Sequence, residues 1–436
     1  MSINPLMSDA LFGAVCAAIG IKETTTLIHG PVGCRYFIHS NIDAQEMLGY
    51  PRFILPCTSV METDILFGGN IKLEKALTKL VKIYPSKFVI VLMSSSCSII
   101  GDDINSVVVS FEKKYKIPTL GVDVPGFGGD VNSGFTRVVT SLLSKFAKTS
   151  SQKIEKSVNI IGSMVGIFNW KNDLKEIKRL FKNMGIKVVS TICADCTLEE
   201  IINSPKAEIN VVLNEEFGLE IARFMEKEYG IPYVGYNCFL PYGFTSTYEW
   251  FTSIGRELGI NVEMVLKREE KRIKAKIFPF IASFGQIHLL RNFPIAIFGN
   301  TSQSTGLARF LSLELGMEPV LFGLKITNKH SNKLIDTLKK ETEINPIIIK
   351  KPDMNDVRNS LVATNPKIIF GSTFERIIGK SIGIHGFVPF SYPVFDKVFI
   401  TDKPYVAYKG ILTLLEEIIN IRYDLPYYLP YKDESS

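Results

Sequence analysis

A short apolar run, followed by a loop rich in glycine, serine or proline and then by an amphipathic helix, recurs along most of this 436-residue chain. Apolar runs of β-branched and aromatic residues are typical of strands buried on both faces of a parallel sheet. Strands that alternate with helices form α/β domains with right-handed crossovers. The chain is also too long for one ordinary hydrophobic core. We therefore expect an α/β protein with several parallel sheets.

The repeated pattern divides into three sets of strands and helices. We expect three Rossmann-like domains around a central crevice, at residues 1–152, 153–290 and 291–436. The last domain ends in a proline-bounded tail, residues 426–431, that does not continue the preceding helix because proline lacks the N–H that a helix needs.

Cysteines follow three of the expected strands in the first domain. The pairs of strand and cysteine are Thr25–Ile28 with Cys34, residues 52–56 with Cys57, and Phe88–Met93 with Cys97. In an open parallel sheet, ligands bind beyond the carboxyl ends of the strands. Thiols that follow three strands of one sheet therefore converge, although they are far apart in sequence. Three thiolates at one edge suit a metal cluster better than a disulfide.

Two alternatives account for the same cysteines. Free cysteine is often a small buried hydrophobic side chain without a ligand. Zinc is the other metal that thiolates commonly bind, but structural zinc sites usually take Cys-x-x-Cys pairs rather than single cysteines on separate strands.

Charge and hydropathy exclude two classes of partner. The 50 basic and 44 acidic residues are mixed along the chain, without a basic stripe for nucleic acid. The apolar run Ala10–Ile21 is too short for a membrane span and follows no basic residues, so we expect an amphipathic helix over Ser8–Ile19 and no membrane association. We expect a cytoplasmic protein whose seven cysteines are reduced.

Distinct motifs surround the three cysteines and others lie near the end of the chain, at His29–Cys34, Met61–Asp64, Phe67–Gly69, Ser96–Asp103, Tyr392–Asp396 and Tyr408–Gly410. They resemble those of nitrogenase component 1 and its relatives, and the resemblance covers nearly the whole chain. The resemblance implies three Rossmann-like domains, and it implies an iron–sulfur protein related to those of nitrogen fixation.

Within this family the chain is most similar to the β-type subunit, over Tyr392–Gly410 in particular. The resemblance implies that Cys34, Cys57 and Cys97 hold one half of an iron–sulfur cluster at a subunit interface. The other half would come from a homologous α-type subunit or from a second copy of this chain. The cluster would be of the four-iron, four-sulfur type or resemble the eight-iron, seven-sulfur P-cluster.

Other positions of the cluster site follow from the same resemblance. Gly33 and Gly101 would let backbone amides approach the sulfides. Family β subunits place a serine in the glycine loop, where this chain has Asp130, whose carboxylate is able to ligate iron. This departure counts against a true P-cluster. The cysteine and histidine that hold the active-site cofactor in α-type subunits correspond to positions near Asn214 and Lys397, so we expect no nitrogenase-type cofactor held in the usual way.

A second group of cysteines lies in the middle domain. Cys193 and Cys196 form a Cys-x-x-Cys pair after one expected strand, and Cys238 follows another. We hypothesise a second redox or metal site from these three residues. Unligated thiols are the favoured alternative, because short motifs often occur by chance.

Several single residues have competing interpretations. His29 either hydrogen-bonds near the cluster or satisfies a buried backbone carbonyl. Asp102 and Asp103 are expected to cap the following helix rather than to act as paired acid and base. His385 is expected in a surface turn, and Cys16 in the core. The loop Gly126–Gly129 lacks the dinucleotide fingerprint, and no P-loop motif occurs, so ATP hydrolysis would belong to another polypeptide.

These observations predict an enzyme, a nitrogenase-like oxidoreductase subunit. It would relay electrons from an ATP-dependent iron–sulfur reductase, component 2, to a substrate or cofactor site. One alternative is a non-catalytic scaffold on which a nitrogenase-type metal cofactor is assembled. Another is a subunit that reduces a tetrapyrrole or an organosulfur compound.

Overall fold

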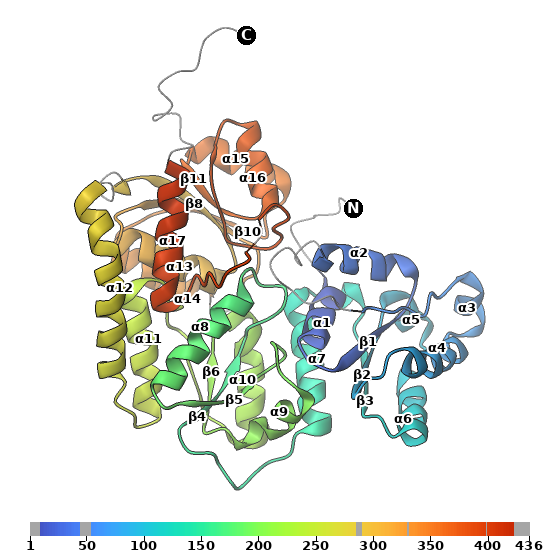
Figure 1. Cartoon of the computed structure of the whole chain (residues 1–436). Helices are drawn as coiled ribbons and strands as arrows, with labels where there is room; N and C mark the ends of the chain where they lie inside the picture. The colour runs from blue at the N-terminus through green and yellow to red at the C-terminus, as the bar shows by residue number, and fades with distance from the viewer. Residues whose placement is uncertain (1–8, 44–53, 285–289, 329–330, 398, 423–436) are drawn as a thin grey trace.

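The computed structural model describes residues 9–43, 54–284, 290–328, 331–397 and 399–422, and it has an α/β architecture with three parallel sheets (Figure 1). All named strand pairs are parallel, as the unalternating apolar runs predict. The fold class is confirmed. The three sheets fall within the three predicted domain ranges, although the exact boundaries stay a prediction.

The first sheet has the order β1-β2-β3. Its strands are β1 (Thr24–His29), β2 (Phe88–Met93) and β3 (Thr119–Asp123). The helices of this region are α1 (Ala10–Ile19), α2 (Val32–Asp43), α3 (Glu62–Phe67), α4 (Asn70–Ile83), α5 (Ser95–Ile100), α6 (Ile104–Tyr115) and α7 (Val131–Phe146). Figure 1 shows this region in blue and cyan, on the right of the molecule.

The second sheet has the order β5-β4-β6-β7. Its strands are β4 (Ser157–Ile161), β5 (Lys187–Thr191), β6 (Ile209–Val212) and β7 (Tyr233–Val234). The helices are α8 (Trp170–Asn183), α9 (Leu198–Asn203), α10 (Glu215–Tyr229), α11 (Gly243–Glu257) and α12 (Glu263–Phe284).

The third sheet has the order β10-β9-β8-β11-β12. Its strands are β8 (Pro294–Gly299), β9 (Glu318–Leu324), β10 (Ile347–Lys350), β11 (Ile368–Gly371) and β12 (Gly386–Pro389). The helices are α13 (Thr301–Leu313), α14 (Ser331–Thr342), α15 (Met354–Thr364), α16 (Thr373–Ser381) and α17 (Ala407–Arg422). The proline-bounded tail lies outside the described residues.

One predicted strand is wrong. Residues 52–56 were expected to form a strand, but the described part of this segment contributes only an isolated parallel bridge between Cys57 and Ile28, and Arg52 and Phe53 lie outside the described residues. The Ile28 N–H donates to Pro56 O at 3.0 Å, and the Thr58 N–H donates to Ile28 O at 3.0 Å. Because Pro56 has no N–H, it does not extend this ladder. Cys57 nevertheless lies beside the carboxyl end of β1.

Close helix packing joins the first region to the rest of the core. Helix α1, which begins one residue after its cap Asp9, packs along α7. A Cβ on Gly134 would lie 1.7 Å from Ala10 O, and one on Gly13 would lie 1.8 Å from Val131 O. Only glycine permits this approach, and a single hydrophobic cluster then extends from α1 into all three sheets. None of the described helices is both long and apolar enough to cross a membrane.

Candidate metal centre

The three first-domain cysteines lie at the carboxyl edge of the first sheet. Cys34 lies in the first turn of α2, directly after β1, and Cys97 lies in α5, directly after β2. Because His29 at the end of β1 pairs with Met93 at the end of β2, both cysteine-bearing segments leave the sheet at the same place. Cys57 reaches this edge through its bridge with Ile28. The three segments that carry the cysteines therefore lie at one edge of the sheet, while the joint ligation of a cluster by their sulfurs stays a prediction.

Burial raises the pKa of all three thiols, that of Cys97 to about 12. The charge of Cys57 raises the pKa of Cys34 further, and Asp102 and then Cys57 do the same for Cys97. The hydroxyl of Ser94 acts in the opposite direction on Cys34 and Cys97 alike. Burial and the neighbouring charges therefore hold these groups as thiols, and a bound metal cation would offset the cost of ionising them. This donor set therefore fits a thiolate-bound metal cluster.

A buried hydroxyl and open space lie next to the thiols. Ser94 Oγ is buried, and it lies close enough to Cys34 and Cys97 to lower the pKa of both thiols. A Cβ added at Gly33 or at Gly101 would meet no described atom within 4 Å. Gly101, with φ of +75°, ends α5 in the left-handed conformation. Gly30 differs, because its Cβ would lie 2.0 Å from Ser94 Oγ. Gly33 and Gly101 are exposed and their part in a cluster site stays a prediction, whereas Gly30 is required by packing.

A buried histidine–aspartate pair stands next to the cysteines. His29 Nε2 lies 3.0 Å from Asp102 Oδ2, and Nδ1 lies 3.0 Å from Thr58 Oγ1, so the ring does not serve a backbone carbonyl. Burial lowers the pKa of His29, with Asp102 opposing it. Ligand atoms of His29, Cys97 and Asp102 all lie within 4.8 Å of one another.

Of the two aspartates expected to cap the following helix, one does so. Asp103 does cap α6, since its Oδ1 accepts the Ser106 N–H at 3.1 Å. Asp102 instead turns inward to His29, and the sequence interpretation missed this role. A usable signal existed, because both His29 and Asp102 stand within a few residues of the cysteines at the strand ends.

Asp130 has other partners in the structure. It caps α7, with Oδ1 accepting the Ser133 N–H at 3.2 Å, and its Oδ2 lies 3.7 Å from Lys351 Nζ. The glycine loop before it is held beside α5, because the Gly126 N–H donates to Ser95 Oγ at 2.8 Å. Its role as a cluster ligand stays a prediction.

The second cysteine group is only partly brought together. Cys193 and Cys196 are fully buried, and each contributes to the cluster of apolar side chains in the main core. Their loop docks on the turn after α1, where the Lys22 N–H donates to Cys196 O at 2.7 Å. Burial raises the pKa of Cys196 to about 12. Cys238 lies beside Glu215 and Glu249, whose charges raise its pKa after the larger effect of burial. These contacts favour packing over ligation.

The remaining candidate residues make ordinary packing and polar contacts or are exposed. Cys16 is fully buried in α1, in agreement with a core position, and His385 is exposed before β12. Lys397 forms an ion pair with Glu417. Asn214 precedes α10 and donates from Nδ2 to Gly162 O at 3.2 Å.

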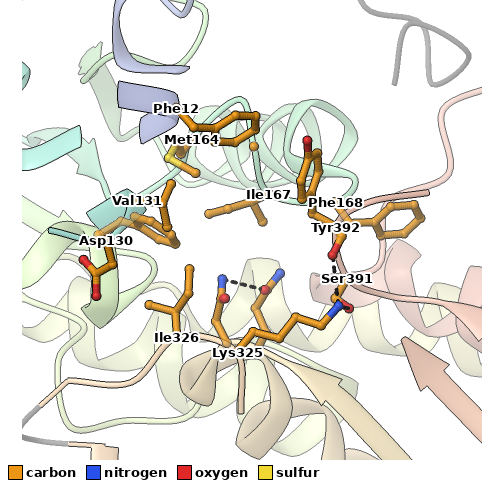
Figure 2. A pocket seen from close by; sticks show the side chains of 14 residues that line it. Phe12, Asp130, Val131, Met164, Ile167, Phe168, Lys325, Ile326, Ser391 and Tyr392 are labelled. Carbon is orange, nitrogen blue, oxygen red and sulfur yellow. Dashed lines mark hydrogen bonds between the residues drawn. The ribbon is translucent and has the colours of Figure 1, made fainter. Parts of the chain in front are cut away.

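A small cavity of about 50 Å³ lies at the centre of the molecule (Figure 2). Its wall includes Phe12 of α1, Asp130 before α7, Met164 after β4, and Lys325 after β9. The buried Lys325 Nζ lies 3.0 Å from each of three oxygens, one on Glu375, one on Ser391 and one on Tyr392. The cationic group of this wall is therefore already neutralised by the protein.

Helices around the three cysteines expose apolar side chains. α3 buries none of its residues, and Phe67 at its end is 88% exposed. Other exposed apolar residues of this region are Val32, Tyr36, Phe37, Met61, Ile65, Leu66, Ile99 and Phe127. Apolar surface of this extent is typical of a protein interface.

Comparisons with known proteins agree with this architecture. The family model described as nitrogenase component 1 type oxidoreductase matches residues 10–422. The nitrogenase iron-molybdenum cofactor biosynthesis protein NifE of Clostridium pasteurianum is 28% identical over 84% of this chain and 77% of its own length. The nitrogenase vanadium-iron protein beta chain of Trichormus variabilis is 26% identical over 98% and 95%.

Further relatives include nitrogenase molybdenum-iron protein alpha chains and a light-independent protochlorophyllide reductase subunit. The solved structure titled nitrogenase Cp1 at pH 6.5 superposes with a TM-score of 0.84 at 20% identity, over the whole of this chain and 96% of that one. Because the family model matches nearly the full chain, this protein is a member of the nitrogenase component 1 family.

Proposed function

We propose that this chain is the subunit of a nitrogenase-like oxidoreductase that holds an iron–sulfur cluster on Cys34, Cys57 and Cys97 and passes electrons through it. The observation that carries the proposal is that three separate segments bring one cysteine each to the same edge of the first sheet. The charge of Cys57 acts on both other thiols and raises their pKa, which supports a single site. When bound, the cluster would supply a one-electron carrier of the four-iron or P-cluster-like type.

The chain's own residues would prepare this site in three ways. The partial burial of the thiols limits their contact with water, and it favours metal-bound sulfur over free thiolates. The hydroxyl of Ser94, which lies beside Cys34 and Cys97, would donate to a sulfur or a sulfide. The open space at Gly33 and Gly101 would let backbone N–H groups approach the same charge.

A partner subunit would complete the centre. Three thiols from one chain leave part of a cluster without ligands, and the apolar side chains exposed on α2, α3 and α5 surround these thiols. We infer that a homologous α-type subunit or a second copy of this chain covers them. A separate ATP-dependent iron–sulfur reductase would supply the electrons, because the sequence has no P-loop.

A second candidate function is supported by several relatives of one kind. NifE of Clostridium pasteurianum, whose name describes a cofactor biosynthesis protein, is similar over most of this chain. A scaffold would hold a metal cluster and release it, whereas an oxidoreductase would keep it. Reduction of a tetrapyrrole is a further possibility, consistent with the similarity to a protochlorophyllide reductase subunit.

Anaerobic purification of the chain with its co-expressed partner tests the proposal. We expect a brown protein with an EPR signal on reduction, and loss of iron in C34S, C57S and C97S. C16S is the matched control, because Cys16 is a buried cysteine in α1 that belongs to the core. A colourless, iron-free wild-type complex would contradict the proposal.

The same preparation separates the two functions. Steady turnover of a small substrate with a reductase and ATP favours the oxidoreductase. Transfer of the bound cluster to an apo-acceptor, without turnover, favours the scaffold.

A further inference from the structure

A continuous hydrogen-bonded chain passes through the buried ring of His29. The Gly30 N–H donates to Thr58 Oγ1 at 3.0 Å, and Thr58 Oγ1 lies 3.0 Å from His29 Nδ1. On the other side of the ring, Nε2 lies 3.0 Å from Asp102 Oδ2. Since a carboxylate only accepts, these partners assign the proton to Nε2, and Thr58 then donates to Nδ1.

The carboxylate of Asp102 has a second buried partner. Its Oδ1 accepts the Gly69 N–H at 2.7 Å, at the junction between α3 and α4. A Cβ on Gly69 would lie 2.5 Å from Asp102 Oδ2 and 3.0 Å from His29 Cε1, so the fit around the pair has no spare room. Asp102 and the ring are therefore fixed from both sides rather than free to rotate.

This pair touches the segments of two candidate ligands. Thr58 is the residue after Cys57, whose own sulfur accepts the Ser59 N–H at 3.3 Å and lies 2.9 Å from Gly30 O. Asp102 lies against Cys97, the most buried of the three thiols, and the Asp102 N–H donates to Cys97 O at 3.1 Å. One buried unit thus connects Cys57 to Cys97 across residues that are distant in sequence.

We propose that His29 and Asp102 are a positioning pair for the cluster ligands, with His29 fixing the Cys57 segment through Thr58 and Asp102 holding a negative charge beside the Cys97 sulfur. This inference rests on the proposed function. Hydrogen bonds and charges next to ligating sulfur set the reduction potential of a cluster. A carboxylate beside one ligand stabilises the oxidised cluster, so the pair would lower the potential as well as fix geometry.

The central test replaces Asp102 with asparagine in the anaerobic complex. Asparagine keeps an acceptor for the Gly69 N–H and nearly the same volume, but it removes the charge. We expect the D102N complex to retain iron, to have a reduction potential more positive than wild type, and to show altered EPR g-values. D103N is the matched control, because Asp103 is adjacent in sequence but its exposed carboxylate bonds Ser106 of the following helix. It should match wild type in all three measurements.

The Thr58→Val variant tests the contact between His29 and the Cys57 segment, because valine has nearly the same shape as threonine. It removes the hydroxyl that joins His29 to the Cys57 segment and leaves the buried Gly30 N–H without its acceptor. We therefore expect less iron per chain and a broadened EPR signal, together with a lower melting temperature of the metal-free protein. The Thr58→Ser variant keeps the hydroxyl and should restore iron content and the EPR signal. If D102N loses iron while its metal-free form melts like D103N, misplacement of Cys97 explains the loss and the proposal stands.

The proposal is overturned if D102N and T58V both equal wild type in iron content, potential and EPR spectrum. An iron-free wild-type complex instead contradicts the proposed function itself. The two failures are therefore distinguishable in one set of preparations.

Discussion

Glu216 in α10 accepts two hydrogen bonds from Ser302 in α13, one from its backbone N–H at 2.8 Å and one from its hydroxyl at 2.7 Å. Both residues are buried. Each lies in the first turn of its helix, so the contact joins the domain of the second sheet to the domain of the third. Burial raises the pKa of Glu216 to about 7, with the Ser302 hydrogen bonds opposing it.

Replacement of Glu216 by glutamine is expected to change the pH dependence of stability. The folded pKa lies above the ordinary value of 4.5, so the folded state binds more protons than the unfolded state between pH 4.5 and about 7. This contribution to stability is complete below pH 4.5, decreases as the pH rises through that window, and amounts to roughly 3 kcal/mol. E216Q should lack the decrease, because glutamine does not ionise. Urea unfolding at several pH values measures it.

The exposed Glu220 on the same helix supplies the control. E220Q should follow the wild-type curve, because its carboxylate faces water. A pH profile of E216Q parallel to that of wild type would show that Glu216 ionises normally in the folded protein.

Asp173 of α8 links the same two domains by a different route. Its Oδ1 accepts the Tyr405 N–H at 2.6 Å and the Val406 N–H at 3.3 Å, just before α17. D173A would leave two buried donors without an acceptor, at a cost of about 2–4 kcal/mol. D173N keeps an acceptor and should lose much less. Hydrogen exchange of a peptide covering residues 403–407 should accelerate in D173A, and equal exchange in D173A and D173N would refute the role of this acceptor.

The approach of α1 to α7 gives a steric prediction. A Cβ on Gly134 would overlap the backbone at Ala10 O, and a backbone atom cannot swing away as a side chain can. G134A should therefore destabilise the protein by about 3 kcal/mol or more, or prevent soluble expression. Thermal denaturation measures the loss. A G134A protein with wild-type melting behaviour would mean that the two helices lie farther apart.

The sequence was informative where a pattern is local. The apolar run Phe88–Met93 and the serines after it predicted both β2 and the position of Cys97 at its end, because period and strand ends are encoded in neighbouring residues. The segment before Cys57 was misread as a strand, since its apolar residues match a strand but Pro56 leaves only a bridge.

Local sequence patterns of this kind do not predict the contact between His29 and Asp102. Asp102 and Asp103 are identical neighbours, yet one is buried against a ring and the other caps a helix in water. Only the direction in which the chain leaves α5 at Gly101 separates them, and that direction is set by tertiary packing rather than by local preference.

Gly33 separates stability from metal binding. It lies inside α2, and an added Cβ would meet no described atom, so G33A should leave the metal-free protein as stable as wild type or up to about 1 kcal/mol more stable, because alanine favours helix. The same methyl group would occupy the space beside Cys34 that a cluster needs. We therefore expect G33A to contain less iron per chain than wild type after anaerobic loading, and the control G230A, far from the site at the end of α10, to load fully although its φ of +65° makes alanine strained. Full iron loading of G33A would mean that the space at Gly33 does not face the cluster.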